Sequence, residues 1–208
     1  MIPTAVGFTA LMLVLLVWSE ANRPRLRRLF KMLASSGFLV VAVSAGAYDS
    51  PYGRWILVGL ACSWLGDLLL TVDARSGFLG GLLAFALAHV AYGIGFTVRG
   101  LAVGWLLGAA IPVVVLGVAV VRWLRPHLGP ILRAPVLAYV VVISVMVIAA
   151  FGTVGADPDW RIAIGAVTFS LSDIAVARNR FVAPGFVNRA WGLPLYYLGQ
   201  VLLAVSPS

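Results

Sequence analysis

Long apolar segments alternate with short polar breaks along the chain. Most segments approach the roughly 20 residues with which a helix crosses a bilayer, and the breaks contain Arg, Asp, Pro and Gly. This pattern predicts an all-α polytopic membrane protein with eight transmembrane helices, in a single membrane domain of residues 1–208. The expected helices lie near 3–18, 31–47, 54–71, 78–98, 101–121, 133–151, 160–177 and 190–206.

The composition favours lipid as the solvent of this chain. Of the 208 residues, 62% are hydrophobic and 11% are charged, whereas about a quarter of a soluble domain is charged. The net charge of +8 comes from cations in the short breaks, so we interpret it as a topology signal and expect no nucleic-acid partner. Arg supplies 14 of the 15 basic residues, which favours a bacterial source with a GC-rich genome.

The distribution of basic residues predicts the orientation. The breaks after the odd-numbered segments hold 12 Lys and Arg residues, and those after the even-numbered segments hold three, Arg54, Arg99 and Arg161. Because loops rich in Lys and Arg stay in the cytoplasm, we expect both termini on the non-cytoplasmic side of a bacterial inner membrane. This orientation requires a helix break at Arg99–Gly100, since one long helix there would invert the second half.

Two acidic residues, Asp67 and Asp173, lie inside apolar segments. Each precedes the predicted cytoplasmic end of its helix by about four residues, or ~6 Å, so both are expected at one depth near the cytoplasmic leaflet. An ionised carboxylate there is costly unless it is paired, protonated or beside a wet cavity. The other acids are expected to be solvated in or beside loops (Glu20, Asp49, Asp157, Asp159) or at a helix end (Asp73).

The two acidic segments share the pattern Ser-x-x-Gly/Ser-Asp, and each is followed by a helix with polar side chains. These polar residues come 22 to 27 positions after the acid and are His89 and Tyr92 in the first half, Tyr196 and Gln200 in the second. A parallel 4+4 internal repeat explains this spacing. Coincidental similarity explains it equally well.

Several polar side chains can converge on the two acids. His89 and Tyr92 are three residues apart and share a helix face, and Tyr196, Tyr197 and Gln200 lie in the last segment. Taken singly, each can equally serve interhelical hydrogen bonding and packing. Lys31 can supply a cation for a phosphate, pair with an acid, or extend its ammonium group to the membrane interface.

Other chemistries lack their residues. The chain has no Gly-x-Ser-x-Gly elbow, no phosphate-cradling Gly-rich loop, and too few His and Cys residues for a His-rich zinc site. We therefore expect neither a metal nor a cofactor. The spacing of Gly100, Gly104 and Gly108 predicts close helix packing in the fifth segment.

Two signatures in this chain resemble those of the YhhN-like lysoplasmalogenase family. The first is Ser63-x-x-Gly66-Asp67-x-x-Leu70 followed by Phe78-x-Gly80-Gly81-Leu82-x-Ala84-Phe85-x-x-x-His89-x-x-Tyr92. The second is Ser172-Asp173-x-x-x-Ala177-x-Asn179-Arg180-Phe181 followed by Tyr196-Tyr197-x-x-Gln200-x-Leu202. The chain departs from the family pattern at Met32, where Pro is usual, and at Ile174, where Ser is frequent.

The resemblance implies an eight-helix membrane hydrolase. Characterised members cleave the vinyl ether bond of lysoplasmalogens to a fatty aldehyde and a glycerophospho-alcohol, so a lysophospholipid within the membrane is the expected substrate, with its tail among Phe85, Phe169 and Leu-rich faces. We expect Asp67 and Asp173 to be catalytic, one protonated and one ionised, with their roles not assigned. The expected substrate-binding residues are Lys31, His89, Tyr92, Asn179, Arg180, Tyr196, Tyr197 and Gln200.

Two other functions are compatible with this sequence. A proton-coupled transporter or lipid translocator also places paired acids inside a repeat of membrane helices. An accessory membrane subunit would need neither acid. The sequence alone does not determine the oligomeric state.

Overall fold

The computed structural model describes residues 1–72 and 75–208, so the helix end expected at Asp73 lies outside the described residues. Within these ranges the chain is all-helical, with eight α-helices and no strand. The helices are α1 Ile2–Asn22, α2 Arg27–Ser44, α3 Pro51–Leu69, α4 Arg75–Arg99, α5 Val103–Leu124, α6 Pro130–Ala156, α7 Trp160–Ala177 and α8 Phe186–Val205. Three short helical segments adjoin them: the 3-10 helices η1 Pro24–Leu26 and η2 Arg125–His127, and the π-helix η3 Arg178–Val182.

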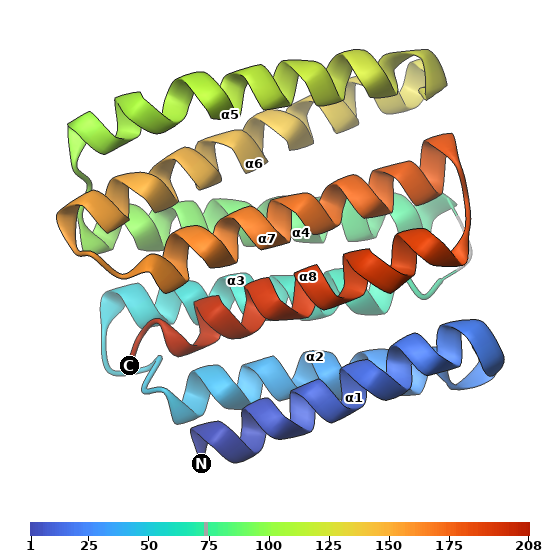
Figure 1. The fold of residues 1–208 in the computed structure, drawn as a ribbon, viewed down its shortest axis with the longest axis horizontal. Helices are drawn as coiled ribbons and strands as arrows, with labels where there is room; N and C mark the ends of the chain where they lie inside the picture. The colour runs from blue at the N-terminus through green and yellow to red at the C-terminus, as the bar shows by residue number, and fades with distance from the viewer. Residues whose placement is uncertain (73–74) are drawn as a thin grey trace.

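The helices form a bundle of antiparallel neighbours (Figure 1). Consecutive helices pack in pairs, α1 with α2, α3 with α4, α5 with α6 and α7 with α8, while α8 also contacts α1, α2 and α3. Both chain termini lie at the same end of the bundle, which we call the terminal end. Asp67 and Asp173 lie near the other ends of α3 and α7, so both belong to the opposite end of the bundle.

The connection between α4 and α5 is a distinct turn. α4 ends at Arg99 and α5 begins at Val103, and Gly100 between them has φ +117°. Glycine adopts this left-handed conformation without the steric cost that a Cβ would add. The helix break on which the predicted orientation depends is therefore present.

Several helices begin earlier than the apolar pattern indicates, and the difference is largest for α2 and α8. α2 begins at Arg27 and α8 at Phe186, four residues before the starts predicted at 31 and 190. The additional first turn of α2 is basic, and that of α8 contains Asn188 and Arg189. Arg is a good helix former, but hydropathy identifies only the apolar part of a helix.

Five helical segments are long and apolar enough to cross a membrane. They are Ile2–Asn22, Arg75–Arg99, Val103–His127, Pro130–Ala156 and Trp160–Val182. The remaining helices, α2, α3 and α8, carry polar side chains such as Lys31, Asp67 and Gln200, which reduce their mean hydropathy. The chain is thus a multi-pass helical membrane protein, and its least apolar helices contain much of the candidate site.

Glycine allows the closest helix pairs to approach. A Cβ at Gly66 of α3 would lie 2.7 Å from the Phe85 ring of α4, and one at Gly199 of α8 would lie 2.8 Å from the Gly165 carbonyl of α7. The prediction of close packing along the fifth segment is wrong. A Cβ at Gly104 or Gly108 would meet no atom within 4 Å, because α5 packs mainly against α6 and much of its surface is exposed.

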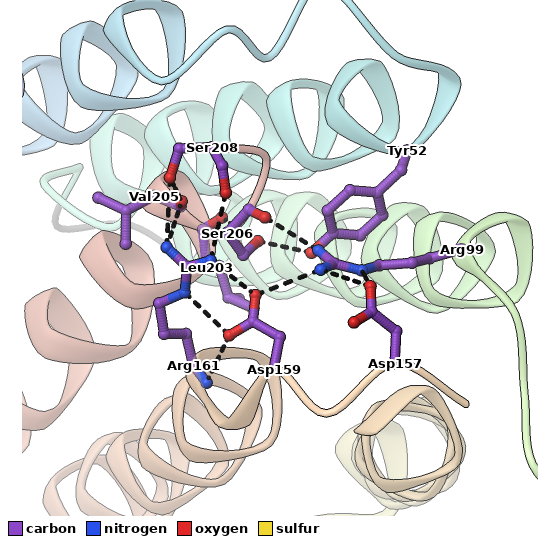
Figure 2. Close-up of polar contacts among 9 residues, drawn as sticks. All are labelled: Tyr52, Arg99, Asp157, Asp159, Arg161, Leu203, Val205, Ser206 and Ser208. Carbon is purple, nitrogen blue, oxygen red and sulfur yellow. Dashed lines mark hydrogen bonds and ion pairs between the residues drawn. The ribbon is translucent and has the colours of Figure 1, made fainter. Parts of the chain in front are cut away.

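An ion-pair network closes the terminal end (Figure 2). Arg99 bonds Asp157 at 2.8 Å and Asp159 at 3.4 Å, and it donates to the Ser206 carbonyl just after α8. Arg161 bonds Asp159 at 2.8 Å. The expectation that Asp159 is solvated is wrong, since its side chain is 9% exposed, whereas that of Asp157 is 52% exposed. Two guanidinium groups replace the water that the Asp159 carboxylate loses.

Candidate active site

A cavity of about 680 Å³ lies at the opposite end of the bundle. Its polar part is lined by Glu20, Arg27, Lys31, Asp67, Arg75, Asp173, Asn179, Arg180, Asn188 and Arg189. Its apolar part, which we call the apolar arm, is lined from α5 and α6 by Pro112, Val113, Leu116, Val120, Tyr139, Val140, Ile143, Val147 and Phe151. Charged groups therefore lie beside the apolar arm, an arrangement that the binding of an amphiphile requires.

Asp67 is a buried carboxylate with a full set of partners. Lys31 Nζ lies 3.0 Å from Asp67 Oδ1, while Ser35 and Tyr196 each donate a hydroxyl hydrogen bond to Oδ2 at 2.6 Å. A cation and two hydroxyl donors stabilise the ionised form of a carboxyl group. Of the alternatives for Lys31, the structure supports pairing with an acid.

Tyr197 supports this arrangement from behind. Its hydroxyl lies 3.0 Å from Ser35 Oγ and donates to the Lys31 carbonyl at 3.1 Å. Tyr197 is buried, and its ring packs against Phe38. It therefore orients the α2 residues that contact Asp67, and it does not line the cavity itself.

Tyr92 and Gln200 form a separate buried contact between α4 and α8. The Tyr92 hydroxyl donates to Gln200 Oε1 at 2.6 Å, and Gln200 Nε2 donates to Ser63 Oγ at 3.3 Å. Ser63 lies one helical turn before Asp67 on α3. These predicted binding residues satisfy one another's hydrogen bonds beneath the cavity, an interhelical role that the sequence left open.

The Asp173 carboxyl group faces a histidine ring rather than a Lys or Arg side chain. His89 Nε2 lies 3.4 Å from Asp173 Oδ2, and the His89 side chain is fully buried. The other ring nitrogen, Nδ1, lies 2.6 Å from the Phe85 carbonyl oxygen. The Tyr139 hydroxyl of α6 is a further neighbour of the Asp173 carboxyl.

Aromatic rings hold His89 in place. Phe169 stacks on the imidazole with a centroid distance of 4.4 Å, and Tyr139 meets it edge-on at 5.4 Å. Phe85 lines the cavity, as expected of a residue near the lipid tail, but Phe169 is fully buried and is not part of the cavity wall. Phe169 therefore packs against the histidine instead of forming a tail-binding surface.

The two carboxyl groups line the same cavity with separate partners. Among residues 1–72 and 75–208, Asp67 and Asp173 form no hydrogen bond with each other. Nor do the described residues contain a group of three His, Cys, Asp or Glu side chains that could hold a metal ion. The arrangement is one of two carboxyl groups with different environments rather than a contacting dyad.

Asn179 and Arg180 lie at the polar rim of the cavity. Asn179 Oδ1 accepts hydrogen bonds from the Gly185 backbone and from Asn188, which orders the loop before α8. Arg180 is exposed and lies over the Phe78 ring at 4.8 Å. Asn179 thus shapes the rim, and Arg180 remains accessible to an anionic group.

Sequence reasoning missed several residues of the site. They are Ser35 and Tyr139, which neighbour the two carboxyl groups, and the cavity-lining residues Glu20, Arg27, Arg75, Asn188 and Arg189. Glu20 was expected to be solvated, but its side chain is 7% exposed and pairs with Arg189 at 2.7 Å, because the end of α1 packs against the start of α8. Tyr139 carried a usable signal, since it is a lone polar residue on an otherwise apolar face of α6, and Ser35 lies one helical turn after Lys31 on the same face of α2.

Comparison with known proteins places the chain in a family. Residues 26–207 match the YhhN family. The chain is 32% identical over 186 residues to Lysoplasmalogenase TMEM86A of Bos taurus, covering 86% of this chain and 72% of that protein. It is 31% identical over 177 residues to the Lysoplasmalogenase of Mycobacterium tuberculosis, covering 76% and 62%. No solved structure matches. The chain belongs to the YhhN family.

Proposed function

We propose that this protein is a membrane hydrolase that cleaves the vinyl ether bond of lysoplasmalogen-type lysophospholipids. Its relatives are named lysoplasmalogenases. The observation that carries the proposal is that Asp67 and Asp173 line the polar part of one cavity, beside its apolar arm. Such a cavity suits a lipid with one hydrocarbon chain, whose reactive bond lies between the chain and the headgroup.

The chemistry needs an acid and a base. A carboxylic acid protonates the β-carbon of the vinyl ether, which leaves an oxocarbenium ion on the carbon bonded to oxygen. Water adds to that carbon and loses a proton to a carboxylate, giving a hemiacetal that collapses to the fatty aldehyde and the glycerophospho-alcohol. The net change is the addition of one water molecule. Two carboxyl groups in different protonation states supply these steps, as they do in glycosidases.

The dimensions and charges of the cavity support this mode of binding. Along α6 the apolar arm extends from Tyr139 to Phe151, twelve residues or about 18 Å. The hydrocarbon region of one leaflet is about 15 Å thick, so the arm is long enough for a single lipid tail. Arg75 and Arg180 at the polar part supply positive charge for a phosphate.

A membrane orientation is part of the proposal. In the proposed arrangement all eight helices cross the inner membrane of a bacterium, the termini lie on the non-cytoplasmic side, and the polar part of the cavity opens toward the cytoplasmic leaflet. The excess of Lys and Arg in the loops at that end supports this orientation. A reporter fused after Ser208 tests it: activity of a periplasmic reporter is expected, and activity of a cytoplasmic reporter would reverse the assignment.

The proposed 4+4 repeat is supported by equivalent helix neighbours. α2 packs against α3 and α8, and its counterpart α6 packs against α7 and α4. Each aspartate also receives a side chain from the fourth helix of the other half: Tyr196 of α8 contacts Asp67 of α3, and His89 of α4 contacts Asp173 of α7. Each half of the repeat thus contributes one aspartate to the site, and the two aspartates have different partners.

The decisive experiment incubates purified protein in detergent with a lysoplasmalogen and follows the products by mass spectrometry. Fatty aldehyde and the glycerophospho-alcohol are expected in equal amounts. Asp67→Asn and Asp173→Asn should each lower kcat by about 10²-fold or more, the contribution expected of a group that transfers a proton. Asp49→Asn, the same change at an exposed turn, is the matched control and should retain activity.

Two outcomes would contradict the proposal. Full activity in either folded aspartate variant would remove that carboxyl from the mechanism. Lipid that crosses proteoliposome membranes without covalent change, driven by a pH gradient, would identify a transporter or translocator instead.

A further inference from the structure

The hydrogen bonds of His89 determine where its proton lies. A backbone carbonyl can only accept a hydrogen bond, so the 2.6 Å contact between His89 Nδ1 and the Phe85 carbonyl requires a hydrogen on Nδ1. In the neutral imidazole the second nitrogen, Nε2, then carries only a lone pair. That lone pair points at Asp173 Oδ2, 3.4 Å away.

Two acceptors cannot face one another at that distance in a buried site without a proton between them. Neither His89 Nε2 nor Asp173 Oδ2 has a hydrogen-bond partner elsewhere in the described part of the chain, and unpaired buried polar atoms are costly. One additional proton satisfies both atoms. It resides on Asp173 and is donated to Nε2, or it resides on Nε2 and is donated to the carboxylate.

Asp67 occupies the related position in the other half and differs in this respect. Its carboxylate has the Lys31 ammonium and two hydroxyl donors, so its partners satisfy it in the ionised form. Within residues 1–72 and 75–208, no Lys or Arg forms an ion pair with Asp173. The permanent cation, Lys31, pairs with Asp67, whereas the shared proton belongs to Asp173 and His89.

We propose that Asp173 and His89 together hold the proton delivered to the β-carbon of the substrate, and that Asp67, paired with Lys31, is the ionised carboxylate that stabilises the cation and accepts a proton from water. This assignment rests on the proposed hydrolase function. Asp173 lines the cavity in which the proposed substrate binds, whereas the fully buried His89 is a positioning residue that acts through Asp173.

The proton balance of a turnover follows from this assignment. Asp173 gives the shared proton to the β-carbon, leaving an ionised carboxylate opposite neutral His89. The attacking water loses a proton to Asp67, and the hemiacetal passes its own hydroxyl proton to the departing oxygen. Transfer of the proton from Asp67 through the water of the cavity to Asp173 restores the starting state.

Other titratable groups near the pair are few. Tyr139 of α6 faces Asp173. Beyond the Phe169 ring, which stacks on His89, lie Tyr92 of α4 and Tyr196 of α8. Lys31 and Asp67 line the same cavity, and the apolar arm from α5 contributes no charged side chain at the pair. The shared proton is thus the labile one in this part of the site.

Nitrogen NMR of histidine-labelled protein tests the proton position without any need for activity. The chain has two histidines, and His127 is exposed, so His127→Gln leaves His89 as the single labelled ring. The expected spectrum shows a protonated Nδ1, and Asp173→Asn should change the Nε2 signal. An unprotonated Nδ1, with the hydrogen on Nε2 of a neutral ring, would overturn the proposal.

The pH profile of kcat tests the assignment of roles. His89→Gln should lower kcat by about 10²-fold and move the alkaline limb to lower pH, because the proton loses one of its two sites. Lys31→Met should move the acidic limb to higher pH, because Asp67 loses the cation that favours its ionised form. If His89→Gln moved the acidic limb and Lys31→Met moved the alkaline limb, the roles of Asp67 and Asp173 would be reversed. If the wild type releases no aldehyde, the hydrolase function fails, while NMR still decides the position of the proton.

Discussion

The two ends of the bundle each contain buried carboxylates, but they use them differently. At the terminal end Arg99 and Arg161 balance Asp157 and Asp159, and the guanidinium groups also bind carbonyls at the end of α8 (Figure 2). At the opposite end the Asp67 carboxylate is balanced by Lys31, but Asp173 faces the uncharged partners His89 and Tyr139 and an open cavity.

This difference separates structural from chemical uses of the same residue type. A fully paired network beside helix ends fixes the relative position of helices, since breaking it would leave a charge without a partner in a poorly solvated place. A carboxyl group that is mostly buried and has no permanent cation favours its protonated form, and it can transfer that proton. In this molecule the cavity accompanies the second arrangement, and no cavity residue belongs to the terminal-end network.

The largest effect expected at the terminal end is on stability. Asp159→Asn removes the carboxylate shared by Arg99 and Arg161, and it should lower the free energy of unfolding by about 2–3 kcal/mol. This value is below the roughly 3–5 kcal/mol typical of fully buried pairs, because the Arg161 side chain is 39% exposed. Thermal unfolding in detergent measures the loss, and kcat per folded molecule should be unchanged.

Asp157→Asn is the matched control for that experiment. Asp157 belongs to the same network, but its side chain is 52% exposed, so the expected loss is under about 1 kcal/mol, as for surface ion pairs. A loss of kcat in the folded Asp159→Asn protein would show that the two ends are coupled. The distinction between a structural and a chemical end would then fail.

The sequence indicated which acids line the cavity better than it indicated the partners of acidic side chains. Asp67 and Asp173 were identified because an acid inside an apolar run is conspicuous, and the alternation of apolar runs and breaks predicted the all-helical fold. The contacts of Glu20 with Arg189 and of Asp159 with Arg99 join residues 169 and 60 positions apart. Helix packing creates such contacts, so a charge pattern along one chain could not indicate which loop acids become buried.

A smaller effect is expected at the cavity, on the selectivity for the length of the lipid chain. Val113 lines the apolar arm on α5, eleven residues or about 16 Å from Leu124 at the far end of that helix. Val113→Phe should shorten the arm, so that kcat/KM for a long-chain vinyl ether falls about tenfold relative to a short-chain one, within the range that one or two methylene groups contribute in an apolar pocket. The assay compares aldehyde release from the two lipids.

Val115→Phe is the control, since Val115 is 63% exposed and does not line the cavity. An equal loss for both chain lengths, or the same selectivity change in Val115→Phe, would show that the tail binds elsewhere, and the apolar arm would then have no more catalytic role than the terminal end.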